Sequence, residues 1–147
     1  MDTMALTRPT VQRARRNWLT ARPAAAAEAR SYVRAAIHAW HIPVDSDIAI
    51  LLTSELVTNA IAHVAGQTIM LTITCQRDQL RVDVHDTSCS APVLMEASDD
   101  AEAGRGMMLV ATLSTDWGCY QTLAGKAVYF TLAFPPSLGA AEASQVA

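Results

Sequence analysis

Apolar residues recur along this chain with two different periods, and these periods divide it into helical and extended segments. Spacings of three and four residues predict a helix from Ala24 to about Trp40, with an apolar stripe formed by Ala29, Val33, Ala36, Ile37 and Trp40. Pro43 separates this segment from a second helix, which is predicted to begin near Asp45-Ser46-Asp47 and to run to Gly66, because these residues cap helix starts well. A third helix is predicted from Gly104 to Leu113.

Alternation with a period of two marks the extended segments, which are residues 16–20, 68–74, 80–86, 117–122 and 126–134. The first of these is predicted to be a short edge strand, and the others form two hairpins. Residues 87–103 contain Pro92, several serines and an acidic cluster, but little periodicity. Long ordered loops of this kind tend to be functional lids, so we predict a lid there.

Length and composition indicate one globular domain in a chain of 147 residues. Hydrophobic residues make up 51% of the chain, but much of this share is Ala, and no apolar run is long enough to span a membrane. No uninterrupted apolar segment of signal-peptide length follows the first arginines. We therefore expect a cytoplasmic protein that does not contact membranes. The predicted divisions are a flexible basic arm at 1–15, a folded domain at 16–134 and a disordered tail at 135–147.

Cysteine and charge content exclude further classes. Cys75, Cys89 and Cys119 lack Cys-x-x-Cys spacing, which favours reduced thiols over a zinc cluster or a disulfide frame. Residues 1–34 carry seven arginines and two acidic residues, whereas the whole chain has a net charge of −3. Because the only aromatic residues in 1–34 are Trp18 and Tyr32 and the body is acidic, we expect no direct nucleic-acid binding.

The most informative polar pattern is a stripe on the second predicted helix. Glu55, Asn59 and His63 are spaced by four, so their side chains lie along one helix face. Carboxylate and amide oxygens suit Mg²⁺ and the activation of a hydroxyl group. The alternative is a solvated face, but Glu55 is the only charged residue in 48–66, and a solvated face usually carries several charges. His63 has a second interpretation as a helix-end cap.

Three further positions carry candidate chemistry, each with a plainer alternative. Gly104-Arg105-Gly106 at a predicted helix start would bind phosphate through unpaired N–H groups and one cation, or would only form a tight turn. Asp86 at a strand end would accept a hydrogen bond from the exocyclic amine of a base, or would begin a turn through its side chain. Lys126, the only lysine, follows Gly125 in the last hairpin, where a lysine is usually solvated. Walker and Gly-x-Gly-x-x-Gly motifs are absent from the sequence.

The order and spacing of these motifs resemble the GHKL (Bergerat-fold) ATP-binding superfamily, and within it the small anti-sigma-factor serine/threonine protein kinases. The similar strings are Ser54-Glu55-Leu56-Val57-Thr58-Asn59-Ala60, Gly104-Arg105-Gly106-Met107-Met108-Leu109-Val110, Asp116-Trp117-Gly118 and Gly125-Lys126-Ala127-Val128-Tyr129-Phe130. The resemblance covers about residues 16–134. It implies an α/β two-layer sandwich, a mixed β-sheet covered on one face by three helices, with ATP between the Glu55 helix and the lid.

The resemblance also implies a role for each residue of the site. Glu55 would be the catalytic base on the attacking hydroxyl, Asn59 would ligate a Mg²⁺ ion that bridges the phosphates, and Asp86 would read the adenine amine. The other implied ATP-binding residues are His63, Gly104, Arg105, Gly106, Met107 and Lys126. The implied partners are an anti-sigma-factor antagonist, which is phosphorylated, a sigma factor, and a second copy of the chain in a homodimer. This role belongs to bacterial transcription regulation.

Two departures from the family pattern bear on activity. The pattern Asp-x-Gly-x-Gly reads Asp86-Thr87-Ser88-Cys89-Ser90 here, and the loss of both glycines would stiffen the lid hinge or weaken nucleotide binding. Ala127 stands where threonine is common, which would cost one hydroxyl contact. These departures keep open a second hypothesis, a non-catalytic ATP-binding regulatory module that controls a partner by nucleotide-dependent binding. A sensor histidine kinase is a third hypothesis, disfavoured because residues before 44 leave no room for a phospho-accepting hairpin.

Overall fold

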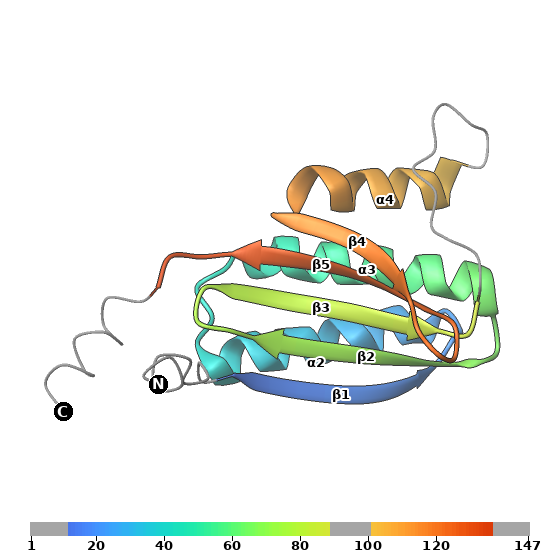
Figure 1. Cartoon of the computed structure of the whole chain (residues 1–147), viewed down its shortest axis with the longest axis horizontal. Coiled ribbons are helices and arrows are strands. Elements are labelled where there is room, and N and C mark those ends of the chain that lie inside the picture. The colour runs from blue at the N-terminus through green and yellow to red at the C-terminus, as the bar shows by residue number, and fades with distance from the viewer. Residues whose placement is uncertain (1–11, 89–100, 137–147) are drawn as a thin grey trace, which may run out of the picture.

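The computed structural model describes residues 12–88 and 101–136, with residues 101–105 described by their backbone alone. This part of the chain forms a five-stranded sheet and three helices (Figure 1). In chain order the elements are β1 (Arg13–Thr20), α2 (Ala24–Trp40), α3 (Ser46–Val64), β2 (Thr68–Cys75), β3 (Gln79–Asp86), α4 (Ala101–Leu113), β4 (Asp116–Gln121) and β5 (Lys126–Ala133). The strands lie side by side in the order β1-β2-β3-β5-β4. The α/β fold class predicted from the sequence is confirmed.

Every described pair of neighbouring strands is antiparallel, so the sheet is not mixed as predicted. One helical crossover between two strands would return the chain to start a parallel strand. Two helices connect β1 to β2, however, and the second carries the chain back to the end where β1 finished. After β3, the helix α4 leads to β4, which runs parallel to β3, but β5 lies between these two strands. No parallel neighbours therefore arise in the described sheet.

The core lies between one face of the sheet and the helices. Alternate residues of the central strands point to this face, and α4 contributes side chains to the same core. Its fully buried members include Leu56, Leu71, Val82, Val84, Met107, Val110 and Phe130. Asp86 and Lys126 continue the inward-facing rows of β3 and β5. The strand period therefore turns both of these ionisable side chains towards the helices.

Local sequence signals set the helix ends. The Asp45 carboxylate caps α3, because it accepts hydrogen bonds from the backbone N–H groups of Asp47 at 2.9 Å and Ile48 at 3.2 Å. His41 ends α2 in the left-handed conformation, with φ 53°. Gly66 follows α3 with φ 84°, a value that glycine adopts without strain. The predicted bounds of both helices are confirmed to within two residues.

Two other boundaries differ from the predictions. β1 begins at Arg13, so residues 13–15 of the predicted arm pair with β2 in the sheet. α4 begins at Ala101 and not at Gly104, because Ala101-Glu102-Ala103 are good helix formers that extend the helix backwards. The two glycines therefore lie within the first turns of α4. The remainder of the predicted arm to residue 11, lid residues 89–100 and tail residues 137–147 lie outside the described residues.

By length and composition alone, α3 is the one described helix that could cross a membrane. Its apolar side chains have another use in this fold. Leu52, Leu56 and Val57 are buried in the core, and the helix packs against α2, α4 and the sheet. The central position of α3 therefore accounts for its apolar character.

Candidate nucleotide site

A buried ion pair joins the end of β3 to the start of β5. The register places Asp86 opposite Lys126. Lys126 Nζ lies 3.0 Å from Asp86 Oδ2 and 3.4 Å from Oδ1, and the two side chains are 4% and 1% exposed, in the order Lys126 and Asp86. Each charge compensates the other where water cannot. The plainer interpretation of Lys126 as a solvated hairpin residue is therefore wrong.

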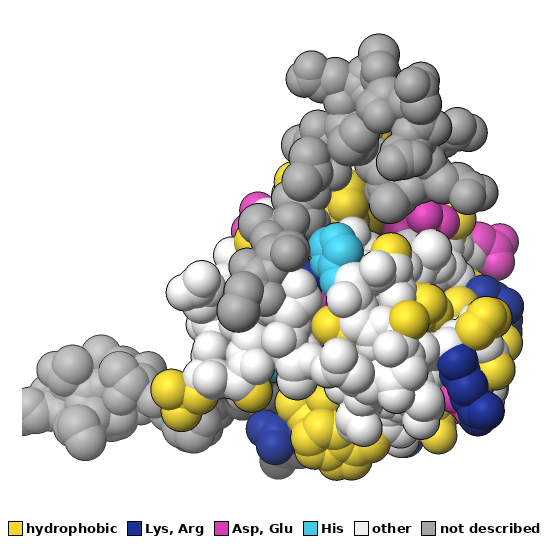
Figure 2. All heavy atoms as spheres, turned by 90° about the vertical axis from the view of Figure 1, so that its right-hand side faces the viewer, with side chains coloured by type: hydrophobic (Ala, Val, Ile, Leu, Met, Phe, Trp, Pro, Cys, Tyr) yellow, Lys and Arg dark blue, Asp and Glu magenta, His cyan; other side chains and the backbone are white. Residues whose placement is uncertain are grey.

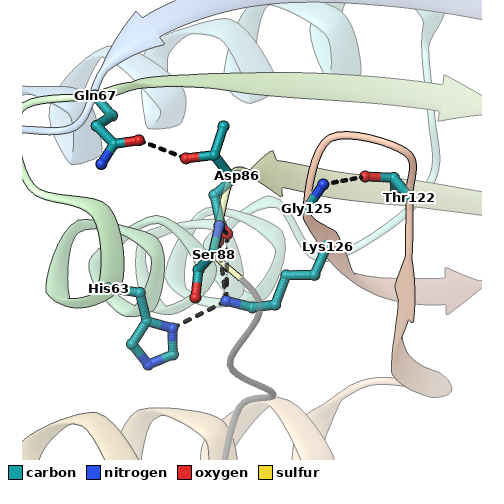
Figure 3. A network of polar contacts seen from close by, with 8 residues as sticks. His63, Gln67, Asp86, Ser88, Thr122, Gly125 and Lys126 are labelled. Atoms are coloured by element: carbon teal, nitrogen blue, oxygen red, sulfur yellow. Dashed lines mark hydrogen bonds and ion pairs between the residues drawn. The ribbon is translucent and has the colours of Figure 1, made fainter.

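The His63 ring joins this ion pair from the last turn of α3. Lys126 Nζ lies 2.9 Å from His63 Nδ1, so the ammonium group donates to the ring when Nδ1 carries no proton. Figure 3 shows the Lys126 side chain reaching between the His63 ring and Asp86. Partial loss of hydration lowers the pKa of His63 and the Lys126 charge lowers it further, while Asp86 opposes both effects.

Although its Nδ1 atom contacts Lys126, His63 as a whole is exposed to solvent. Figure 2 looks at the end of the molecule where β3 ends and β5 begins. A histidine ring is visible on this face among mostly uncharged side chains and backbone, with most of the charged groups farther out (Figure 2). The His63–Lys126–Asp86 network therefore leads from an exposed ring to a buried carboxylate.

Close packing and hydrogen bonds hold the backbone around Asp86. The Ser88 N–H donates to Asp86 Oδ1 at 2.7 Å, so Asp86 also begins a turn through its side chain. The Thr87 hydroxyl donates to the Gln67 side chain. A Cβ on Gly125 would overlap the Asp86 carbonyl oxygen and the Thr87 backbone. Only glycine therefore lets the β4–β5 turn approach the end of β3 this closely.

A second group of predicted residues lies between α3 and α4. The half-buried Glu55 carboxylate is packed against Gly106, where an added Cβ would overlap Oε1 and lie 3.3 Å from Cδ. Asn59 follows one helical turn later and is 4% exposed. Its Nδ2 atom has no hydrogen-bond partner among the described residues. A buried amide without a partner is unusual, so this nitrogen is available to a group outside the described residues.

The Asn59 amide fits a magnesium ion that arrives with a nucleotide. Its oxygen and nitrogen exchange places when the amide rotates by half a turn, so the group can present either atom to the site. Among the described residues, no group of three or more His, Cys, Asp or Glu side chains is arranged to hold a metal ion. Nucleotide-bound Mg²⁺ takes most of its ligands from phosphates and water. One protein oxygen is therefore compatible with such an ion.

Comparison with protein-family models matches residues 19–132 to the histidine kinase-like ATPase domain. The match runs from the end of β1 to β5 and includes both groups of site residues. The chain belongs to this family. It is therefore an ATP-binding, kinase-like domain of the GHKL type. Comparison with curated proteins finds no match.

The ATPase domain thus carries its predicted site residues in two neighbouring groups along one face of α3. They are Glu55, Asn59 and Gly106 between α3 and α4, and His63, Asp86 and Lys126 at the end of the sheet. Met107 was also predicted to bind ATP, but its side chain is 1% exposed and belongs to the core. The side chain of Arg105 lies outside the described residues, as do Cys89 and Ser90.

Ser88 and Ala127, which depart from the family pattern, both lie among the described residues. Ser88 does not have a positive φ, so the conformation at this position does not require glycine. Ala127 pairs with His85 and Tyr120 in the sheet. Because neighbouring residues of a strand point to opposite faces, the Ala127 side chain points away from Asp86. A threonine hydroxyl at this position would also point away from the site.

Several contributors to the site are missing from the sequence-based prediction. Gln67, just before β2, and Thr87, just after β3, form a hydrogen bond through their side chains. No sequence motif predicts this contact. Gly125 was taken as a turn residue, but its main contribution is the close approach to Asp86. The contact between His63 and Lys126 joins residues 63 positions apart. The spacing of residues within one helix gives no signal for it.

Proposed function

We propose that this ATPase domain is a Mg²⁺-dependent serine/threonine protein kinase that acts as an anti-sigma factor in bacterial transcription regulation. Its phosphorylated substrate would be an anti-sigma-factor antagonist protein. The observation that carries the proposal is the position of the Glu55 carboxylate, which is packed against Gly106 one turn from the buried Asn59 amide. This places a candidate base and a candidate metal ligand beside the first turns of α4.

The first turn of α4, residues 101–104, is suited to bind phosphate through its backbone, and Gly106 follows in the next turn. Backbone N–H groups in the first turn of a helix have no partner within the helix, and the helix dipole favours anions there. The absence of a side chain at Gly106 lets the Glu55 carboxylate approach this end of α4. A base near a phosphate-binding helix end can reach a hydroxyl group that attacks that phosphate.

In the proposed reaction, a serine or threonine hydroxyl oxygen of the antagonist attacks the γ-phosphorus of ATP. A bond forms between this oxygen and the γ-phosphorus, and the bond from the γ-phosphorus to the β,γ-bridging oxygen breaks, so that ADP leaves. Glu55 accepts the hydroxyl proton. Phosphoryl transfer depends mainly on positioning and electrostatic stabilisation. The packing that fixes Glu55 therefore contributes as much as its basicity.

Asn59 would hold Mg²⁺ through its amide oxygen, and the ion, when bound, would neutralise charge on the phosphate oxygens. The amide nitrogen has no partner among the described residues, so no described contact prevents the amide from turning its oxygen to the ion.

The partner proteins are proposed from the resemblance to anti-sigma-factor kinases, and exposed apolar side chains are consistent with them. Met108, Leu109 and Leu113 of α4 are 49%, 37% and 36% exposed, and they lie on the helix that carries Gly106. Trp18 of β1 is 70% exposed. Apolar side chains that gather on a surface often bind other proteins. We propose the antagonist, a sigma factor and a second copy of the chain as these partners, all in the cytoplasm.

Phosphate transfer with a matched pair of variants tests the kinase proposal. The full chain is incubated with γ-labelled ATP, Mg²⁺ and candidate antagonist proteins, and the phosphorylated position is mapped. Glu55→Gln should lower transfer by about 10²–10⁴ while ATP affinity is kept, because the carboxylate contacts the hydroxyl and not the nucleotide. Glu28→Gln is the control, since Glu28 is an exposed glutamate on α2, and it should transfer phosphate like the wild type.

A different result would favour the regulatory module. If the wild type binds ATP but phosphorylates no antagonist protein, and Glu55→Gln leaves partner binding unchanged, the kinase proposal is wrong. Partner binding that changes with ATP in the same experiment would then identify a non-catalytic, nucleotide-controlled binding protein.

A further inference from the structure

The buried pair of Asp86 and Lys126 offers a ligand more than a carboxylate. A lysine ammonium group has three N–H donors. One N–H group is shared between the two Asp86 oxygens, at 3.0 and 3.4 Å, and another is directed to His63. The third then has no partner among the described residues. The Asp86 oxygens provide about four acceptor positions, of which Lys126 and the Ser88 N–H occupy three. Within residues 12–88 and 101–136, one donor and one acceptor of this ion pair therefore remain without a partner.

We propose that Lys126 is a specificity-determining residue of the nucleotide site, and that its ammonium group donates a hydrogen bond to ring nitrogen N1 of adenine while Asp86 accepts one from the neighbouring exocyclic amine. N1 and the amine are adjacent on the edge of the base. Lys126 Nζ and Asp86 Oδ2 are adjacent in the protein, 3.0 Å apart. The inference rests on the proposed function, because it takes ATP as the ligand at Asp86.

A carboxylate without the lysine would bind the exocyclic amine of adenine but would offer no donor to N1. The lone pair of N1 is repelled by a negative charge, whereas the ammonium beside the carboxylate attracts it. Both side chains are nearly inaccessible to water, and hydrogen bonds in such surroundings are stronger than in solvent. His63 is a positioning residue in this arrangement, because its ring holds Lys126 Nζ from the exposed side at 2.9 Å.

Two analogues of ATP separate the proposed contact from general binding of a purine. In 1-deaza-ATP a C–H group replaces N1, and in 7-deaza-ATP the same replacement is made on the opposite side of the base. Titration calorimetry with the full chain should show 1-deaza-ATP binding about 10- to 100-fold more weakly than ATP, the usual loss for a hydrogen bond to a charged donor. The control 7-deaza-ATP should bind with an affinity close to that of ATP. Equal affinities for ATP and 1-deaza-ATP would overturn the proposal.

A double variant assigns the contact to Lys126. Lys126→Met alone would leave the Asp86 charge buried without its partner, so Asp86→Asn is combined with it. The asparagine oxygen can still accept from the adenine amine. In this double variant the ratio of the affinities for ATP and 1-deaza-ATP should fall towards one. A folded double variant that keeps the wild-type ratio would show that another group contacts N1. If the double variant does not fold, the comparison of the two analogues on the wild type still tests the contact, because it needs no substitution.

The same measurements distinguish failure of this inference from failure of the kinase proposal. If ATP does not bind the full chain, both proposals are wrong. If ATP binds and its phosphate is transferred to the antagonist while 1-deaza-ATP binds equally well, only the role of Lys126 is wrong. If 1-deaza-ATP binds weakly and no phosphate is transferred, the Lys126 contact stands without the kinase activity.

Discussion

Asp86 shows how one residue combines a structural and a functional role. Its carboxylate balances the buried charge of Lys126, starts a turn through the Ser88 N–H and, in our proposal, receives the adenine amine. A substitution at Asp86 therefore changes folding and binding together. This coupling decides how mutagenesis of the site has to be designed.

We expect Asp86→Ala to lower the free energy of unfolding by about 3–5 kcal/mol, because it leaves the Lys126 ammonium buried without its counter-charge. Urea unfolding of the purified variant measures this loss. Asp78→Ala is the control, since Asp78 is exposed in the turn between β2 and β3, and it should change little. A variant of Asp86 that unfolds at the wild-type urea concentration would contradict the structural role of the pair.

Asn59 leads to a prediction about magnesium. Asn59→Ala should remove the Mg²⁺-dependent part of nucleotide affinity, because it deletes the proposed protein ligand. Calorimetry with ATP in Mg²⁺ and in EDTA measures that part directly. Thr58→Ala, at the exposed neighbouring position, is the control. If the variant keeps the full gain in affinity from Mg²⁺, Asn59 does not hold the ion.

Secondary-structure elements place the site through their ends. α3 brings His63 in its last turn to the end of β3, and the turn between β4 and β5 packs on the same place through Gly125. Because this packing is close, a single added carbon atom at Gly125 would displace the turn. The relative position of these elements therefore creates the His63–Lys126–Asp86 network.

Gly125→Ala should push the β4–β5 turn away from the end of β3, since its Cβ would overlap the Asp86 carbonyl and the Thr87 backbone. We expect a loss of about 1–3 kcal/mol of stability, as for other overpacked positions, together with weaker ATP binding because Lys126 moves with the turn. Thermal unfolding and calorimetry measure the two effects. Leu123→Ala in the same turn is the control, because Leu123 is fully exposed. Unchanged ATP affinity in the glycine variant would separate the turn from the nucleotide site.

The elements could be predicted from the sequence because each one has its own period. Apolar spacing placed α2 and α3 almost to the residue, and alternation placed the four strands of the two hairpins. The order of strands in the sheet is not contained in these local patterns. The mixed sheet came from the family resemblance, whereas all described neighbours are antiparallel. The start of α4 was missed because Ala101-Glu102-Ala103 carries no apolar stripe, although its helix propensity is high.

The site could be predicted only as far as it follows from motifs. The face shared by Glu55, Asn59 and His63 comes from helical spacing alone. The ion pair of Asp86 and Lys126 joins residues 40 positions apart and depends on the register of β3 with β5. No spacing rule specifies such a register. A carboxylate and a lysine in separate hairpins therefore gave no signal that they would neutralise each other.

On the scale of the whole molecule, the two faces of the sheet carry different chemistry. On the inner face, the rows of β3 and β5 are apolar until they reach Asp86 and Lys126. On the outer face Arg81 forms two hydrogen bonds of 2.9 Å with Asp83, which also accepts one from the Tyr120 hydroxyl at 3.0 Å. His85 packs edge-on against Tyr120, with 6.4 Å between the ring centroids. One histidine therefore lies on each face, His63 in contact with Lys126 on the inner face and His85 in contact with Tyr120 on the outer.

These two histidines predict that the folded protein loses stability in mild acid. Loss of hydration is the main cause that lowers the pKa of both residues from the ordinary value of 6.5. At His63 the Lys126 charge lowers the pKa further and Asp86 opposes it. At His85 the Asp83 charge opposes burial more strongly than either Arg16 or Arg81 supports it, and the pKa is lowered on balance. As the pH falls through 6.5, the unfolded chain takes up protons at these positions before the folded chain does. The stability is thus present above this pH and decreases below it.

Urea unfolding between about pH 7.5 and 5.5 measures this dependence, in the range where histidine titrates. The wild type should become steadily less stable towards the acid end, and His63→Gln combined with His85→Gln should flatten the curve. His38→Gln, at an exposed position of α2, is the control and should keep the wild-type slope. If the double variant loses stability as steeply as the wild type, the two histidines do not cause the loss of stability in acid. Their protonation would then be equally favourable in the folded protein and in the unfolded chain.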